Sequence, residues 1–270
     1  AVVARGMGTC CVAGCGEISI REECKTLSCG GLTLTEGDII SVDGSSGCIY
    51  SGEIPTVLVE NNQDLQRLLS WADEVARLKV RANAETVKDL ETAMKFGAQG
   101  VGLARTEHMF FGQDRILEMR RLILADNEEE IKIALKLLLH FQEEDFYHMF
   151  RAVQDKPMII RLLDPPMHEF LPKDPQEIKL LAEKLHKSPE KLARQIENLQ
   201  ENNPMLGHRG CRLGITQPEI YKMQAEAIFR SAIRLHQEGL KIKPKIMIPL
   251  IADKKELDFV KSYLNEHIQC

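Results

Sequence analysis

Short apolar runs alternate with helix-like patterns from residue 80 to the end of the chain, and this alternation most strongly constrains the fold. Repeated strand–helix units with nearly continuous apolar strands are typical of a parallel sheet covered by helices. We therefore predict an α/β fold. The five predicted strands lie within residues 78–84, 100–106, 156–164, 210–216 and 243–253. Helices are predicted at 85–96, in a long region at 114–153, in a stretch ending at 200, at 218–236 and at 254–268.

The placement of arginines bears on the architecture of this sheet. A closed (β/α)8 barrel needs eight strand–helix units, whereas about five could also build an open doubly wound sheet. Arg81, Arg105, Arg161, and Arg209 or Arg212 recur at or near the carboxyl ends of several predicted strands. Barrel active sites lie at that face. The pattern therefore favours an incomplete (β/α)8 barrel of the TIM type.

The first 60 residues differ in composition from the rest. They contain six of the eight cysteines, ten of the 18 glycines and one of the 11 prolines, and eight acidic residues against three basic ones. Their apolar runs at 10–20 and 37–53 predict short strands, the second pair flanking the turn signal Asp43-Gly44. We predict three segments: a glycine-rich module at 1–60, a linker helix at 61–79 and the barrel part at 80–270.

Charge and cysteine usage narrow the class of protein. The net charge is -5, and basic residues are interspersed with acidic ones, which argues against a nucleic-acid surface. No apolar run reaches about 18 residues, so we expect a soluble protein without a membrane span or signal peptide. Cys10, Cys11, Cys15, Cys24 and Cys29 invite a zinc interpretation, but their spacing does not form paired CxxC motifs, and reduced structural thiols are favoured.

Arg105 and Arg161 are the strongest candidates for binding a ligand. A single arginine at a strand end is more often part of a structural ion pair: Arg105 could pair with Glu107 and Arg161 with Asp164, while Arg209 could be exposed. Several guanidinium groups around one site, however, need an anionic partner to offset their repulsion. Guanidinium groups bind carboxylate and phosphate bidentately and keep their charge. We interpret Arg105 as part of an anion clamp.

Five stretches of the chain resemble the pyruvate phosphate dikinases, a family of phosphoenolpyruvate-utilising enzymes. They are "AVVARGMGTCCVAGCGEI" at 1–18, "VRANAET" at 80–86, "GLARTEHMFF" at 102–111, "IIRLLDPPMHEFLP" at 159–172 and "NPMLGHRGCRLGI" at 203–215. The resemblance implies that 1–60 is the end of the swivelling phosphohistidine domain. It also implies that 80–270 is the first part of the barrel that binds phosphoenolpyruvate and pyruvate.

The resemblance implies a reaction and roles for particular residues. Such enzymes interconvert ATP, phosphate and pyruvate with AMP, diphosphate and phosphoenolpyruvate through a phosphohistidine, with Mg²⁺ bridging the substrate oxygens in the complete enzyme. Arg105 and Arg161 match the arginines that hold the phosphoryl and carboxylate ends of the substrate. Arg209 is expected to support them. Glu107 and Asp164 are expected to orient the guanidinium groups. His108 and His168 are expected to pack near the arginines or to form hydrogen bonds with the arginines' neighbours.

The resemblance also indicates parts of the family pattern that this sequence lacks. The phosphohistidine and the ATP-binding domain are expected upstream of Ala1, and the metal-binding carboxylates and the acid cysteine beyond Cys270, so Cys211 is not given the acid role. We therefore expect a fragment that is inactive alone, or alternatively a non-catalytic remnant acting as a binding or interaction module. The complete enzyme is expected to be a cytoplasmic homodimer, with an organellar targeting segment upstream left open.

Overall fold

The computed structural model describes residues 3–4, 8–55, 63–201 and 203–269. The chain divides into two compact units, residues 1–76 and 77–270, which are described separately.

The first unit contains short antiparallel strands, as its sequence predicts. A three-stranded sheet has the order β1-β2-β3, and β4 and β5 form a separate hairpin. In the turn after Asp43, the Asp43 carboxylate accepts hydrogen bonds from the hydroxyl of Ser46 (2.6 Å) and the backbone N–H of Ser45 (2.9 Å), which lower its pKa. The predicted run at 10–20 is mostly irregular, and only its last two residues belong to a strand, β1. The bounds are β1 Ser19–Arg21, β2 Thr26–Cys29, β3 Leu32–Thr35, β4 Ile40–Asp43 and β5 Cys48–Ser51.

Helix α2, Gln63–Val75, lies within the predicted linker helix, of which residues 61–62 fall outside the described part. Its apolar face is exposed, with Leu68 at 58% and Leu69 at 53% of their full accessible surface. No described residue of this first unit is fully buried. The apolar periodicity of α2 thus marks a real helix.

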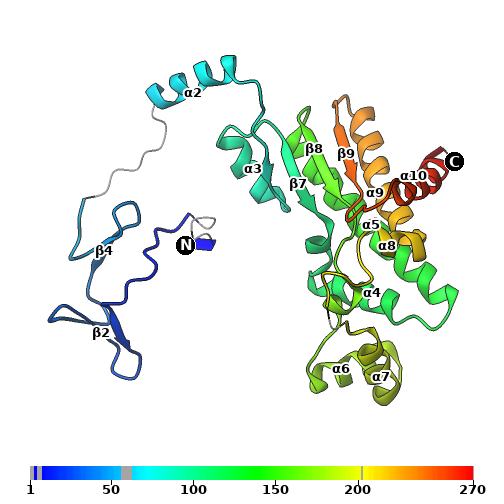
Figure 1. The fold of residues 1–270 in the computed structure, drawn as a ribbon, viewed down its shortest axis with the longest axis horizontal. Helices are drawn as coiled ribbons and strands as arrows, with labels where there is room; N and C mark the ends of the chain where they lie inside the picture. Colours follow the sequence, from blue (N-terminus) through cyan, green and yellow to red (C-terminus); the bar gives the residue numbers. More distant parts are fainter. Residues whose placement is uncertain (1–2, 5–7, 56–62, 202, 270) are drawn as a thin grey trace. The chain divides into compact units, whose positions relative to one another are not determined.

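The second unit is built on a four-stranded parallel sheet with the consecutive order β6-β7-β8-β9 (Figure 1). Right-handed crossovers between consecutive parallel strands place all connecting helices on one face of the sheet. A doubly wound sheet would reverse its strand order, so this order is the one that strands of a (β/α)8 barrel follow. The strands are β6 Ala82–Asn83, β7 Val101–Arg105, β8 Pro157–Arg161 and β9 Lys243–Met247.

Helices bury one face of this sheet and leave the other accessible. On β8, Met158 and Ile160 are fully buried in the main hydrophobic core. The alternate side of β9 carries Lys243, Lys245 and Met247, which are exposed. We call this second side the open face. The helices around the sheet are α3 Val87–Lys95, α4 Gln113–Ile123, α5 Glu128–Val153, α9 Pro218–Gln237 and α10 Lys254–Gln269. None of the described helices combines the length and apolar composition that a bilayer span requires.

The predicted strand at 210–216 is wrong, because these residues form helix α8, Cys211–Thr216. A short apolar run cannot be distinguished from a buried helical turn by periodicity alone. Gly210 precedes the helix with φ +58°, a conformation that suits glycine, and Gly214 lies directly against the ring of Tyr221. The two glycines thus serve a helix start and a close packing contact, and the sheet has four strands in the described part of the chain.

The predicted long helix at 114–153 is interrupted between α4 and α5. Asn127 caps α5, since its side-chain oxygen accepts a hydrogen bond from the backbone N–H of Glu130 at 2.9 Å. The segment between α4 and α5 lies against a helical pair, α6 Pro175–Leu185 and α7 Pro189–Leu199, which is drawn below the sheet in Figure 1. This pair has its own small core, which includes Leu124, Leu181 and Leu192.

Acid is expected to loosen the α6–α7 pair through Asp126. Hydrogen bonds from Lys191 and Lys187 lower the pKa of Asp126 from 3.8 to about 2. Because the folded pKa is depressed, this stabilisation is complete above pH 3.8 and is lost as the pH falls towards about 2. We expect Asp126→Asn to flatten the decline of thermal stability over this range. Glu183→Gln, on the exposed surface of α6, is the control; an equal flattening in both variants would contradict the assignment.

Candidate functional site

Arg105 and Arg161 are the last residues of β7 and β8, in agreement with their predicted place at or near the carboxyl ends, and they are register partners in the sheet. Neighbouring strands lie about 4.8 Å apart, and paired residues of parallel strands project to the same face. Both arginines lie on the face opposite the buried Ala104 and Ile160, which is the open face. The two arginine side chains therefore start from neighbouring backbone positions at the carboxyl edge of the sheet.

Arg105 pairs with Glu85, not with Glu107 as one interpretation of the sequence proposed. Its Nη1 lies 2.6 Å from Glu85 Oε1. Glu85 follows β6 and immediately precedes Thr86, the N-cap of α3. Glu85 was not among the predicted site residues, although an acidic residue directly after a predicted strand, at the same edge as Arg105, was an available signal.

Arg161 lies in a cluster of two carboxylates and two guanidinium groups. It forms ion pairs with Glu107 and, at 2.9 Å, with Asp164. Asp164 Oδ2 also accepts from Arg209 Nη2 at 2.8 Å. Glu107 turns inward here because it lies in the 3-10 helix η1, Thr106–Phe110, directly after β7. We call Glu107, Arg161, Asp164 and Arg209 the arginine–carboxylate cluster.

Charge in this region is balanced, but hydrogen-bonding capacity is not exhausted. Together with the Arg105–Glu85 pair, the cluster contains three guanidinium groups and three carboxylates, so the ion-pair interpretation and the clamp interpretation both have a physical basis. A guanidinium has five N–H donors. Arg161 Nε and Arg209 Nε have no hydrogen-bond partner among the described residues. The described contacts thus leave some donors of the arginines unused, and these two nitrogens are buried.

The two predicted histidines lie at the edges of this region. His108 is exposed and contacts Phe111 edge to face, with ring centroids 6.5 Å apart. His168 is partly buried, and its Nδ1 has no partner among the described residues. The predicted hydrogen bonds from these histidines to the arginines' neighbours are not found in the described part of the chain.

Arg81, Arg212 and Cys211 stand apart from the cluster. Arg81 precedes β6, so its predicted place near a carboxyl end is wrong. Arg212 lies inside α8 and donates at 3.0 Å to the carbonyls of Leu206 and Gly207. Burial raises the pKa of the Cys211 thiol, whose Sγ donates to the Leu250 carbonyl at 3.1 Å. None of these three residues forms a described contact with Arg105 or Arg161.

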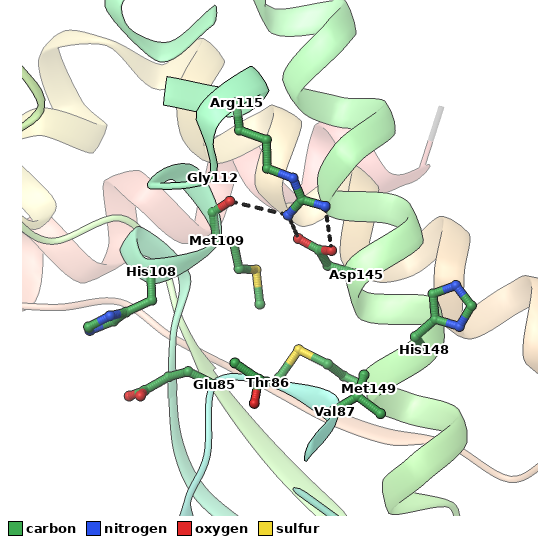
Figure 2. A pocket seen from close by; sticks show the side chains of 10 residues that line it. All are labelled: Glu85, Thr86, Val87, His108, Met109, Gly112, Arg115, Asp145, His148 and Met149. Carbon is green, nitrogen blue, oxygen red and sulfur yellow. Dashed lines mark hydrogen bonds and ion pairs between the residues drawn. The ribbon is translucent and has the colours of Figure 1, made fainter. Parts of the chain in front are cut away.

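A pocket of about 340 Å³ lies beside Glu85, the partner of Arg105 (Figure 2). Its wall includes Glu85, His108 and His148, and one side is closed by Arg115, whose Nη2 lies 2.8 Å from Asp145 Oδ1. Figure 2 shows this ion pair above the cavity and Glu85 at its lower edge. Glu85 therefore both lines the pocket and forms the ion pair with Arg105.

The expected Mg²⁺ needs a group of oxygen ligands. The described ranges contain no group of three or more His, Cys, Asp or Glu side chains that could hold a metal ion. The carboxylates at the site, Glu85, Glu107 and Asp164, are each engaged by arginine. The described carboxylates of the site therefore do not fit a bound cation.

Comparisons with known proteins match both units. Residues 59–269 match the family described as PEP-utilising enzyme, PEP-binding domain, and residues 1–47 match PEP-utilising enzyme, mobile domain. A pyruvate, phosphate dikinase of Clostridium symbiosum is 51% identical over 267 residues, which is 98% of this chain and 30% of the relative. Those of Giardia intestinalis and of Arabidopsis thaliana chloroplasts are each 48% identical, over 98% and 95% of this chain and 30% and 27% of the relative. The chain thus spans about 30% of the length of these relatives.

Proposed function

Because the chain belongs to the family of PEP-utilising enzymes, we propose that its second unit binds phosphoenolpyruvate and pyruvate between Arg105 and Arg161. The observation that carries this proposal is their pairing in register at the carboxyl ends of adjacent parallel strands. Phosphoenolpyruvate carries a phosphoryl group and a carboxylate on a three-carbon frame. Two guanidinium groups that start from neighbouring strands suit a ligand with two anionic ends so close together.

The surrounding carboxylates support this role by orienting the arginines. An arginine side chain is long and flexible, and an ion pair at one edge of the guanidinium limits its motion while leaving other N–H groups for the ligand. Glu85 restrains Arg105, and Glu107 and Asp164 restrain Arg161. Such preorganised donors stabilise the enolate-like charge that develops when phosphoenolpyruvate and pyruvate interconvert.

We propose the dikinase reaction for the protein of which these units form a part. In that reaction a phosphohistidine transfers its phosphoryl group between a nucleotide site and pyruvate, and ATP, phosphate and pyruvate interconvert with AMP, diphosphate and phosphoenolpyruvate. The relatives named pyruvate, phosphate dikinase support this assignment. The described residues contribute substrate binding and orientation, and the 270-residue chain alone is expected to give no sustained formation of AMP.

Titration of the 270-residue chain with phosphoenolpyruvate tests the binding proposal. We expect Arg105→Ala to weaken the affinity at least tenfold, because a charge-assisted contact is worth about 1.5–3 kcal/mol. Arg81→Ala is the matched control, since Arg81 is an exposed arginine at the amino end of the neighbouring strand. Calorimetry or NMR titration gives the affinities; equal affinity of Arg105→Ala and the unmodified chain would contradict the proposal.

A further inference from the structure

The turn that follows β8 connects Arg161 to Asp164, and its backbone is anchored from several elements. The carbonyl of Arg161 accepts from Thr106 Oγ1 at 2.9 Å, and the N–H of Leu162 donates to the Met247 carbonyl at 3.0 Å. The carbonyl of Asp164 accepts from the N–H of Gly210 at 2.9 Å. The turn is thus tied to η1, to the end of β9 and to the segment that carries Arg209.

The remaining residue of the turn, Leu163, is held by two side chains of α9. Its N–H donates to Gln224 Oε1 at 2.8 Å, and its carbonyl accepts from the hydroxyl of Tyr221 at 2.8 Å. Tyr221 and Gln224 are three residues apart on α9, so they project from the same side of the helix. Both backbone polar groups of Leu163 are therefore satisfied by one helix face.

Tyr221 and Gln224 are fully buried, which fixes the geometry of these contacts. A Cβ placed on Gly214 would lie 2.5 Å from the Tyr221 ring, so the ring is held directly against α8. Burial raises the pKa of Tyr221, so the phenol keeps its proton and remains a donor. The Gln224 amide is oriented by the N–H of Leu163, because the reversed amide would set two donors against each other.

We propose that Tyr221 and Gln224 are positioning residues for the substrate arginines. By holding Leu163, they fix the turn that places the Asp164 carboxylate between Arg161 and Arg209. Neither side chain needs to touch the substrate. This inference rests on the proposed function, in that the aligned arginines are taken to bind phosphoenolpyruvate.

The variants Gln224→Met and Tyr221→Phe remove these hydrogen bonds while conserving shape and volume. We expect Gln224→Met and Tyr221→Phe each to weaken phosphoenolpyruvate binding by up to about tenfold, because a loosened turn no longer holds Arg161 in its binding position before the ligand arrives. Ser231→Ala is the matched control. Ser231 is also fully buried on α9 and donates to a carbonyl of another element, Glu143 on α5, at 2.7 Å, but it does not contact the turn.

The experiment compares the unmodified chain with these three variants by phosphoenolpyruvate titration and by NMR of the arginine side chains. The expected result is weaker binding and an altered Arg161 Nε–H signal in Gln224→Met and Tyr221→Phe, with both unchanged in Ser231→Ala. If the unmodified chain binds and both variants retain its affinity and its Arg161 signal, the positioning role is wrong. If the unmodified chain does not bind, the proposed function fails, and the Arg161 signal alone decides the positioning role. Should Gln224→Met not fold, Tyr221→Phe gives the answer by the same two measurements.

Discussion

Replacing Arg161 by alanine is expected to abolish phosphoenolpyruvate binding and to lower the free energy of unfolding by about 3 kcal/mol. Arg161 is the only partner that the structure shows for Glu107 within the described residues, and it shares Asp164 with Arg209. The side chains of Glu107 and Asp164 are only 10% and 5% exposed. Removing the guanidinium leaves carboxylates with little access to water, which is the costly case for a buried ion pair.

Denaturant unfolding and ligand titration of the same samples measure the two effects. Arg121→Ala is the control, because Arg121 pairs with Glu118 on α4, is 33% exposed and lies outside the arginine–carboxylate cluster. We expect that control to lose less than about 1 kcal/mol and to bind normally. The double variant Arg161→Ala with Glu107→Gln should regain part of the stability but none of the binding. Recovery of binding in the double variant, or normal binding in Arg161→Ala, would contradict the assigned role.

Phe146→Ala is expected to lower the free energy of unfolding by about 3–5 kcal/mol, the usual cost of deleting a fully buried aromatic side chain. Phe146 has no exposed surface and stacks on Phe150 with ring centroids 5.9 Å apart. Both rings belong to α5 and to the main core on the helix-covered face of the sheet. Loss of the Phe146 ring should therefore destabilise the second unit as a whole.

Leu137→Ala on the same helix is the control, because it also replaces a large apolar side chain of α5 by alanine but at a position that is not buried. Leu137 is 41% exposed, so its truncation should cost less than about 1 kcal/mol. Chemical denaturation monitored by circular dichroism measures both variants. Similar losses in the two variants would mean that α5 does not face the sheet in the way that the structure describes.

The sequence predicted the parallel sheet and the positions of its two central arginines for a clear physical reason. Strands β7 and β8 are nearly continuous apolar runs, which identify buried strands. The run of β7 ends at Arg105, whereas Arg161 is followed by Leu162 and Leu163 and lies near the end of its run. Arg105 and Arg161 were therefore predicted at or near the carboxyl edge, and the pairing of β7 with β8 brings them together in register. This part of the site follows from local pattern and sheet geometry alone.

Other features depended on contacts between distant segments and could not be predicted from local pattern. Residues 210–216 resemble a strand in composition, but Gly210 and Gly214 allow close approach to Leu250 and Tyr221, and the segment forms a helix. Periodicity does not report which neighbour a glycine must accommodate. The same limit explains the error in the fourth predicted strand and in the number of strands.

The ion-pair partners show the same limit at the level of single side chains. Proximity in sequence suggested that Glu107 binds Arg105, whereas the start of η1 directs it to Arg161, 54 residues away. Tyr221 and Gln224 were not predicted, because nothing in their local sequence distinguishes them from other helix residues. Glu85 was missed although it directly follows a predicted strand at the edge that carries Arg105. Their roles arise only when α3 and α9 meet the ends of the strands.

The most direct test of the central claim is an NMR titration of the unmodified chain with phosphoenolpyruvate, observing the guanidinium signals of Arg105 and Arg161. Each signal can be assigned from the corresponding arginine-to-lysine variant. If both arginines bind one ligand molecule, their signals should shift together and saturate at the same dissociation constant. Saturating phosphoenolpyruvate that leaves either signal unchanged, or that shifts the two with different dissociation constants, would contradict the account.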